Sequence, residues 1–118
     1  MTPIEFLRKR AKEVLTTEHE FVDSIEVVLT TDEKFGWQEG QRLGQYEPLK
    51  KRITLLDVFR NTKLPEIAAD SIFPTYMHEL VHAFQHREMG TAGYLLMLGL
   101  CRWKLEKDAR EIEDSFYR

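Results

Sequence analysis

The stretch that decides the fold of this chain is Tyr76-Met77-His78-Glu79-Leu80-Val81-His82-Ala83-Phe84-Gln85-His86. Its apolar residues recur at i, i+3, i+4 and i+7, which is the pattern of one buried helix face: Met77, Leu80, Val81 and Phe84. The predicted helix has Asp70 or Ser71 as its N-cap, Pro74 in its first turn and Gly90 as its end.

The same helix carries a candidate metal site. Residues four apart in a helix are separated by about 40° around the axis, so His78 and His82 can offer two imidazole nitrogens to one ion. Glu79 can then act on a water as general base, the arrangement of H-E-x-x-H zinc peptidases. The alternative is a helix with two surface histidines. The buried face argues against it, because it holds both histidines at its margins, where ligands are half-buried.

Composition sets the broad class of the protein. At 118 residues the chain predicts one domain, residues 1–118, with 42% hydrophobic and 31% charged residues, as in ordinary globular proteins. The net charge of -3 gives no electrostatic reason to expect nucleic acid or an anionic membrane as partner. Cys101 is the single cysteine and no signal-peptide core follows Met1, so we expect a cytoplasmic monomer. The longest apolar run, Tyr94 to Cys101, is too short to span a bilayer.

Further elements follow from local patterns. Thr2, Pro3 and Glu5 form a capping-box start for an N-terminal helix that we expect to end near Thr17. Strands are predicted over residues 24–31 and 51–59, both rich in β-branched residues. The glycines of residues 32–48 have no accompanying phosphate-binding motif, so we expect a turn or flexible hairpin there. Residues 61–70 read as a connector or short helix.

The chain after Gly93 is predicted to be helical almost to its end. An apolar stripe repeats at steps of three or four residues: Leu98, Cys101, Leu105, Ala109, Ile112 and Phe116. Cys101 falls within this stripe, which predicts a packed core thiol. The fold class is therefore α+β, with an N-terminal helix, a small and mainly antiparallel sheet, the His78 helix and a C-terminal helix that carries glutamates.

A catalytic zinc site needs a third protein ligand besides His78 and His82. On the C-terminal helix, Glu106 and Glu113 flank the apolar stripe at about 80–100° from Leu105, whereas Glu111 lies near the opposite side. Helix geometry thus favours Glu106 or Glu113 and leaves the choice between them open.

The chain resembles the small gluzincin metallopeptidases over about Lys51 to Tyr117. The resemblance rests on His78-Glu79-x-x-His82-x-x-Gln85 and on the later Glu106-Lys107-Asp108-Ala109. It implies a zincin-like domain in which Zn²⁺ is held by His78, His82 and Glu106, with Glu113 as the alternative third ligand. It also implies hydrolysis of peptide or protein substrates by zinc-activated water, with Glu79 as general base. The strand near Ile53 to Phe59 would be the edge strand that holds the substrate.

The chain departs from that family at two points. Arg110 stands where many members have an aspartate that supports a zinc histidine, so Asp108, Asp114 or a backbone carbonyl would have to take this role. No motif identifies the residue that stabilises the oxyanion, for which the candidates are His86, Tyr94 and Tyr117. The rival hypotheses are a zinc-binding module that does not hydrolyse peptides, or a latent peptidase, and a helical domain without metal.

Overall fold

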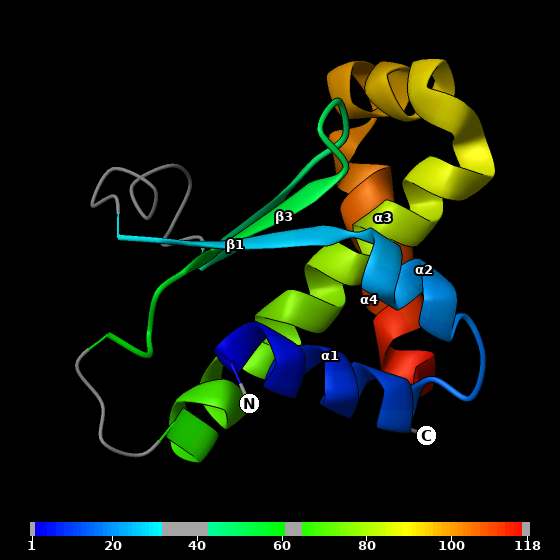
Figure 1. Cartoon of the computed structure of the whole chain (residues 1–118). Coiled ribbons are helices and arrows are strands. Elements are labelled where there is room, and N and C mark those ends of the chain that lie inside the picture. The colour runs from blue at the N-terminus through cyan, green and yellow to red at the C-terminus, as the bar shows by residue number, and fades with distance from the viewer. Residues whose placement is uncertain (1, 32–42, 61–64, 117–118) are drawn as a thin grey trace.

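A computed structural model of the chain describes residues 2–31, 43–60 and 65–116. Within these residues the fold is α+β, as predicted, with helices and a small sheet around one core (Figure 1). The elements in chain order are α1 (Pro3–Val14), α2 (His19–Ser24), β1 (Glu26–Thr30), β2 (Gly44–Glu47), β3 (Arg52–Leu56), α3 (Pro65–Leu100) and α4 (Arg102–Phe116).

The sheet is mixed, which corrects the prediction of a mainly antiparallel sheet. Its described strands lie in the order β1-β3-β2, with β1 parallel and β2 antiparallel to β3. A turn at Pro48 to Lys51 joins β2 to β3, so β2 is a strand in a region predicted to be a turn or flexible hairpin. The rest of that region, residues 32–42, lies outside the described residues. Since β3 is central, the expectation that it forms the substrate-binding edge is wrong.

Helix α3 organises the domain around the predicted buried face. Met77, Leu80 and Val81 are fully buried, and the partly buried Phe84 packs against the same core. From the sheet, Ile53 and Leu55 of β3 enter this core with no exposed surface. In Figure 1, α3 (green to yellow) runs beside the sheet, and α4 (orange to red) returns alongside α3. The prediction of an amphipathic core helix is confirmed.

The ends of α3 differ from prediction on one side only. The helix begins at Pro65, so Pro74 lies inside it and the predicted N-cap at Asp70 or Ser71 is wrong. The predicted interruption at Gly90 is confirmed, because its φ of 76° and ψ of 164° are not helical. A residue with a Cβ is strained at positive φ, whereas glycine is not. The chain therefore changes direction at Gly90, and residues 91–100 continue at an angle to the first part of α3.

The N-terminal helix begins as predicted. The Thr2 side chain accepts a hydrogen bond of 3.1 Å from the Glu5 backbone N–H. The helix ends at Val14, slightly before the expected Thr17. The short helix α2 follows, and it was not predicted from the sequence.

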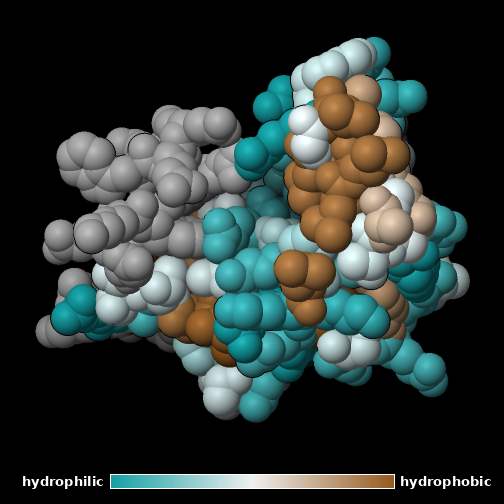
Figure 2. All heavy atoms as spheres, turned by 90° about the horizontal axis from the view of Figure 1, so that it is seen from above, coloured by the Kyte–Doolittle hydropathy of each residue, from teal (hydrophilic) through white to brown (hydrophobic). Residues whose placement is uncertain are grey.

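The C-terminal stripe is divided between two helices. Cys101 lies at the break between α3 and α4 and is partly exposed, so it is not a packed core thiol. Leu105 and Ala109 of α4 are fully buried, but Ile112 is exposed. The segment after Gly90 exposes apolar side chains, which form a large brown area in the view from above (Figure 2): Leu95, Leu96 and Leu100. Trp103 of α4 is also exposed. No helix in the described parts of the chain is both long and apolar enough to cross a membrane.

Candidate metal centre

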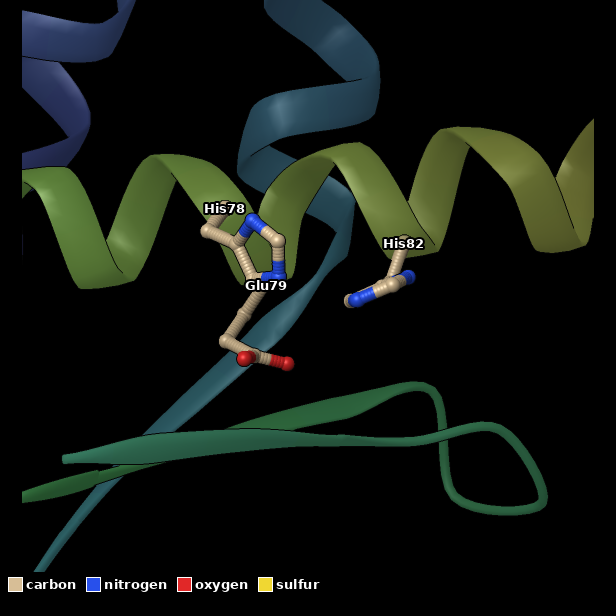
Figure 3. A group of neighbouring side chains, drawn as sticks. All are labelled: His78, Glu79 and His82. Carbon is tan, nitrogen blue, oxygen red and sulfur yellow. The ribbon is translucent and has the colours of Figure 1, made fainter. Parts of the chain in front are cut away.

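The three residues of the central motif lie together on one side of α3. Figure 3 shows the side chains of His78, Glu79 and His82 pointing toward the same space beside the sheet. One ligand atom from each lies within 4.8 Å of the other two, a spacing that could hold one metal ion. Glu79 and His82 are largely buried, with 8% and 5% of their surface exposed. The i and i+4 geometry predicted from the sequence is therefore present.

Glu106 reaches both histidines from α4. Its Oε2 lies 2.9 Å from His78 Nε2, and its Oε1 lies 3.2 Å from His82 Nε2. Ligands bound at about 2.0–2.1 Å in a tetrahedral zinc site are separated by about 3.3 Å. The two distances from Glu106 to the histidines are therefore close to the spacing that one tetrahedral ion requires.

Glu113 has a different position from Glu106. Its Oε2 lies 3.0 Å from Nδ1 of His78, on the opposite edge of the ring from Glu106. An ionised carboxylate can only accept hydrogen bonds, so Nδ1 of His78 carries the proton and donates it to Glu113. Nε2 of His78 faces Glu106, so it donates to that carboxylate when it is protonated and would offer its lone pair there to a metal ion.

Gln85 performs the same task for His82. The Gln85 amide donates from Nε2 to the backbone carbonyl of Leu105 at 3.1 Å, which orients the amide. Its Oε1 then faces Nδ1 of His82 at 2.8 Å and accepts the ring proton. His82 is therefore held in the tautomer whose Nε2 is free for a metal. The link through Leu105 also ties this orientation to α4, the helix that supplies Glu106.

The electrostatics of the site reflect these contacts. The hydrogen bond to Glu106 is the main cause that raises the pKa of His78 to about 9, against the lowering effect of burial. Hydrogen bonds from His78 and His82 hold the pKa of the Glu106 carboxyl far below its usual range. At neutral pH and without a metal ion, Glu106 is therefore an anion and His78 is protonated.

These contacts test whether the residues suit a metal ion. The outer partners occupy both Nδ1 atoms, so both Nε2 atoms face the ionised Glu106 carboxylate and would present lone pairs to a metal ion that replaced the protons between them. Three Lewis bases repel one another unless positive charge lies between them, either as protons or as a cation. Two imidazoles and one carboxylate also match the ligand set of catalytic zinc sites that keep a fourth position open. The donor set fits a zinc ion.

A cleft of about 890 Å³ opens beside these residues. It is lined by His78, Glu79, His82 and Glu106, together with residues 43–46 at the edge of the sheet. Tyr94, on the segment after Gly90, also lines it. This volume is sufficient for a ligand of several residues or a small molecule. Residues of α3, of α4 and of the edge strand β2 thus surround the site.

Strand β2 forms the sheet edge that borders the cleft. Leu56 N–H donates to Leu43 O at 2.8 Å, so Leu43 and Leu56 are a hydrogen-bonded pair. Because hydrogen-bonded and non-hydrogen-bonded pairs alternate in an antiparallel ladder, the backbone groups of Gly44 and Tyr46 point away from β3. No strand within residues 2–31, 43–60 and 65–116 pairs with this edge of β2.

Gly44 allows β2 to approach α3 closely. A Cβ at this position would lie 2.7 Å from Leu55 Cδ2, 2.8 Å from Thr75 Cγ2 and 3.4 Å from Glu79 Cγ. The first two distances are shorter than real Cβ contacts. The absence of a side chain therefore places the free edge of β2 beside Glu79.

His86 connects β2 to the segment after the kink. Its Nδ1 lies 2.6 Å from the Tyr46 hydroxyl, and its Nε2 lies 2.8 Å from Thr91 Oγ1. Burial is the main cause that lowers the pKa of His86 and that raises the pKa of Tyr46 to about 12, so both groups are neutral at pH 7. Both ring nitrogens of His86 already have hydrogen-bond partners. His86 therefore connects β2 to the segment after Gly90, and this role suits it better than binding an oxyanion.

The second candidate for binding the oxyanion, Tyr94, faces the site. It lines the cleft with 2% of its surface exposed, and burial, followed by the charge of Glu79, raises the pKa of its phenol. Tyr117 lies outside the described residues. Glu111 is exposed and does not line the cleft, in agreement with the helix geometry.

The support expected from Asp108 or Asp114 comes instead from Glu113 and Gln85. Gln85 is the last residue of the motif that begins at His78, but no role was predicted for it from the sequence. The signal available was its spacing three residues after His82, which places both on one helix face. Strand β2 was missed because its four residues lie among glycines.

Comparison of the chain with protein-family models, with curated proteins and with solved structures gave no match. The geometry of the site is therefore the basis of the function proposed for this chain.

Proposed function

We propose that this protein is a zinc metallopeptidase with a minimal zincin-like domain of the small gluzincin type. The observation that carries the proposal is the convergence of His78 Nε2 and His82 Nε2 on the Glu106 carboxylate. Glu79 lies beside this cluster in the same cleft. In this proposal His78, His82 and Glu106 hold the ion, and Glu113 supports His78 from outside.

The chemistry divides between the ion and the chain. A bound zinc ion lowers the pKa of water toward neutrality and polarises the scissile carbonyl. Glu79 removes a proton from the attacking water and delivers it to the leaving amine. Glu79 follows His78 in the sequence and is largely buried at the cleft. This position suits a group that acts beside the ion without replacing a ligand.

Tyr94 is the group we assign to the developing oxyanion. Its raised pKa keeps the phenol protonated at neutral pH, so it can donate a hydrogen bond. The charges of Glu79 and Glu106 both act on this phenol, which indicates that it lies near them.

The substrate is proposed to bind as an extended chain along the free edge of β2. The backbone groups of Gly44 and Tyr46 would pair with the substrate backbone, as in other cases of strand addition. This assigns to β2 the role that the sequence had given to the segment near Ile53.

The test replaces Glu79 with glutamine in the zinc-loaded protein. We expect Glu79→Gln to retain about one zinc per chain and to lose nearly all hydrolysis of unstructured protein such as casein. Glu111→Gln, an exposed substitution on α4, serves as the control and should keep both zinc and activity. Hydrolysis by Glu79→Gln at the wild-type rate would remove Glu79 from its role. A wild-type protein that binds zinc but cleaves nothing would support the non-hydrolytic alternative.

A further inference from the structure

Two arginines flank Glu106 along one face of α4. Arg102, Glu106 and Arg110 are spaced four residues apart, so their side chains form one row along the helix. All three line the cleft. The row therefore places a guanidinium one turn before and one turn after the proposed metal ligand.

Both arginines lack the partner that their helical positions predict. Oppositely charged residues four apart on a helix are close enough to form ion pairs, so Arg102 and Arg110 could each pair with Glu106. Glu106 is instead turned toward the two histidines. Glu113, three residues after Arg110, is bound to His78.

Among the residues that the structure describes, neither Arg102 nor Arg110 forms an ion pair with a carboxylate. Some other cations do so: Arg10 with Asp70, Lys12 with Asp23, Arg52 with Glu26, and Arg87 with Glu18. Lys104 and Lys107 of α4 also form none among the described residues, so what distinguishes the two arginines is that they line the cleft. The guanidinium donors of Arg102 and Arg110 are therefore available to a ligand that enters the cleft.

The spacing of the arginines limits what that ligand can be. Eight helical residues rise about 12 Å, and Glu106 lies midway between the two arginines. An extended peptide advances about 3.4 Å per residue, so about 12 Å corresponds to three or four residues. Guanidinium groups bind carboxylates through two parallel N–H donors, which makes arginine selective for this partner.

We propose that Arg102 and Arg110 form two carboxylate-binding subsites on opposite sides of the scissile bond. The preferred substrate is then a peptide with an acidic group on each side of that bond, about three or four residues apart. This inference rests on the proposed peptidase function, because it names the substrate class of the same cleft.

The test compares peptides that differ only in charge. Blocked peptides with amidated C-termini carry glutamate on both sides of the cleaved bond, on either side alone, or glutamine at both positions. We expect each glutamate to raise kcat/KM about fivefold, the upper end of the range for exposed ion pairs. Added salt at about 0.5 M should reduce this preference, because it screens exposed charges. A neutral peptide with a free C-terminus shows whether a terminal carboxylate serves as well as a side chain.

Single substitutions assign each subsite. Arg102→Gln should remove the preference for glutamate on one side of the bond, and Arg110→Gln should remove it on the other. Lys104→Gln and Lys107→Gln are matched controls, since both lysines are exposed on α4 but do not line the cleft. These controls should keep the full preference, and all four variants should keep stoichiometric zinc.

A binding measurement separates this inference from the proposed function. Fluorescein-labelled forms of the same peptides are titrated with zinc-loaded Glu79→Gln, and anisotropy reports their affinity. Tighter binding of acidic peptides, lost in the arginine variants, would support the subsites even if the wild type cleaves none of them. Equal affinity and equal cleavage of the acidic and neutral peptides would overturn the inference while leaving a peptidase function intact. Loss of the preference in the lysine controls, or loss on the same side in both arginine variants, would also overturn it.

Discussion

Nδ1 of His82 lies 2.8 Å from Oε1 of Gln85, while the Nε2 of the same glutamine donates to the Leu105 carbonyl at 3.1 Å. One buried amide therefore determines which nitrogen of His82 carries a proton and links that choice to α4. Outer partners of this kind contribute about 10- to 100-fold to metal affinity.

Replacement of Gln85 should weaken zinc binding without removing any ligand. We expect Gln85→Met, which keeps a similar volume, to raise the zinc Kd about 10- to 100-fold. Competition with a chromophoric chelator measures the change, and Glu88→Gln, an exposed substitution on the same helix, is the control. An unchanged Kd in Gln85→Met would mean that the amide does not orient His82.

The two glutamates of α4 should have separable effects. Glu106→Gln removes the carboxylate that faces both Nε2 atoms and should abolish stoichiometric zinc binding. Glu113→Gln keeps a polar group beside Nδ1 of His78 and should retain one zinc with a Kd raised about tenfold or more. Metal analysis after dialysis distinguishes the two. The reverse result would make Glu113 the third ligand.

The stability of the metal-free protein should depend on pH through His78 and Glu106. The pKa of His78 is raised from 6.5 to about 9, so the stability from its charged form is present below pH 6.5 and is lost as pH rises through about 9. The pKa of Glu106 is lowered, so its contribution is present above pH 4.5 and is lost only in stronger acid.

The pair therefore stabilises the fold most between about pH 4.5 and 6.5. Urea unfolding of the metal-free protein should show a midpoint that falls from pH 6.5 to 9.5, and His78→Gln should flatten this fall. An equal fall in His78→Gln would assign the effect to other groups.

Strand β2 should be sensitive to any side chain at position 44. Gly44→Ala would bring a Cβ within 2.8 Å of Thr75 Cγ2 and still nearer to Leu55, so we expect about 1–3 kcal/mol of destabilisation. The strand would also shift relative to Glu79, and kcat/KM should fall. Adding Thr75→Ser, which removes the clashing methyl group, should restore part of both. Failure of the double variant to recover would indicate that the contact with Leu55 alone causes the loss.

The phenol of Tyr94 should affect catalysis and not metal binding. We expect Tyr94→Phe to lower kcat about 100-fold, as for removal of one oxyanion donor, with KM and zinc content nearly unchanged. Steady-state kinetics with a blocked peptide gives both parameters. Wild-type kcat in Tyr94→Phe would exclude the phenol from the reaction.

The local pattern of the chain was enough to identify the helix that carries His78, Glu79 and His82 and the break at Gly90, although not the start of α3 at Pro65. Periodicity and capping depend on residues within one or two turns of each other, so the sequence contains them directly. The position of Glu106 and Glu113 on the inner side of the last helix also followed from its period, and both line the cleft.

Which of the two glutamates meets which nitrogen was decided by the tertiary structure. Helical period places them both within reach, but the angle at which α4 packs on α3 directs Glu106 to Nε2 and Glu113 to Nδ1. The sheet gives a second example. Strand order depends on pairing between residues distant in sequence, so only the folded chain put β3 in the centre and left β2 at the cleft. Local periods determined what each element is, whereas long-range packing determined which atoms face one another across the cleft.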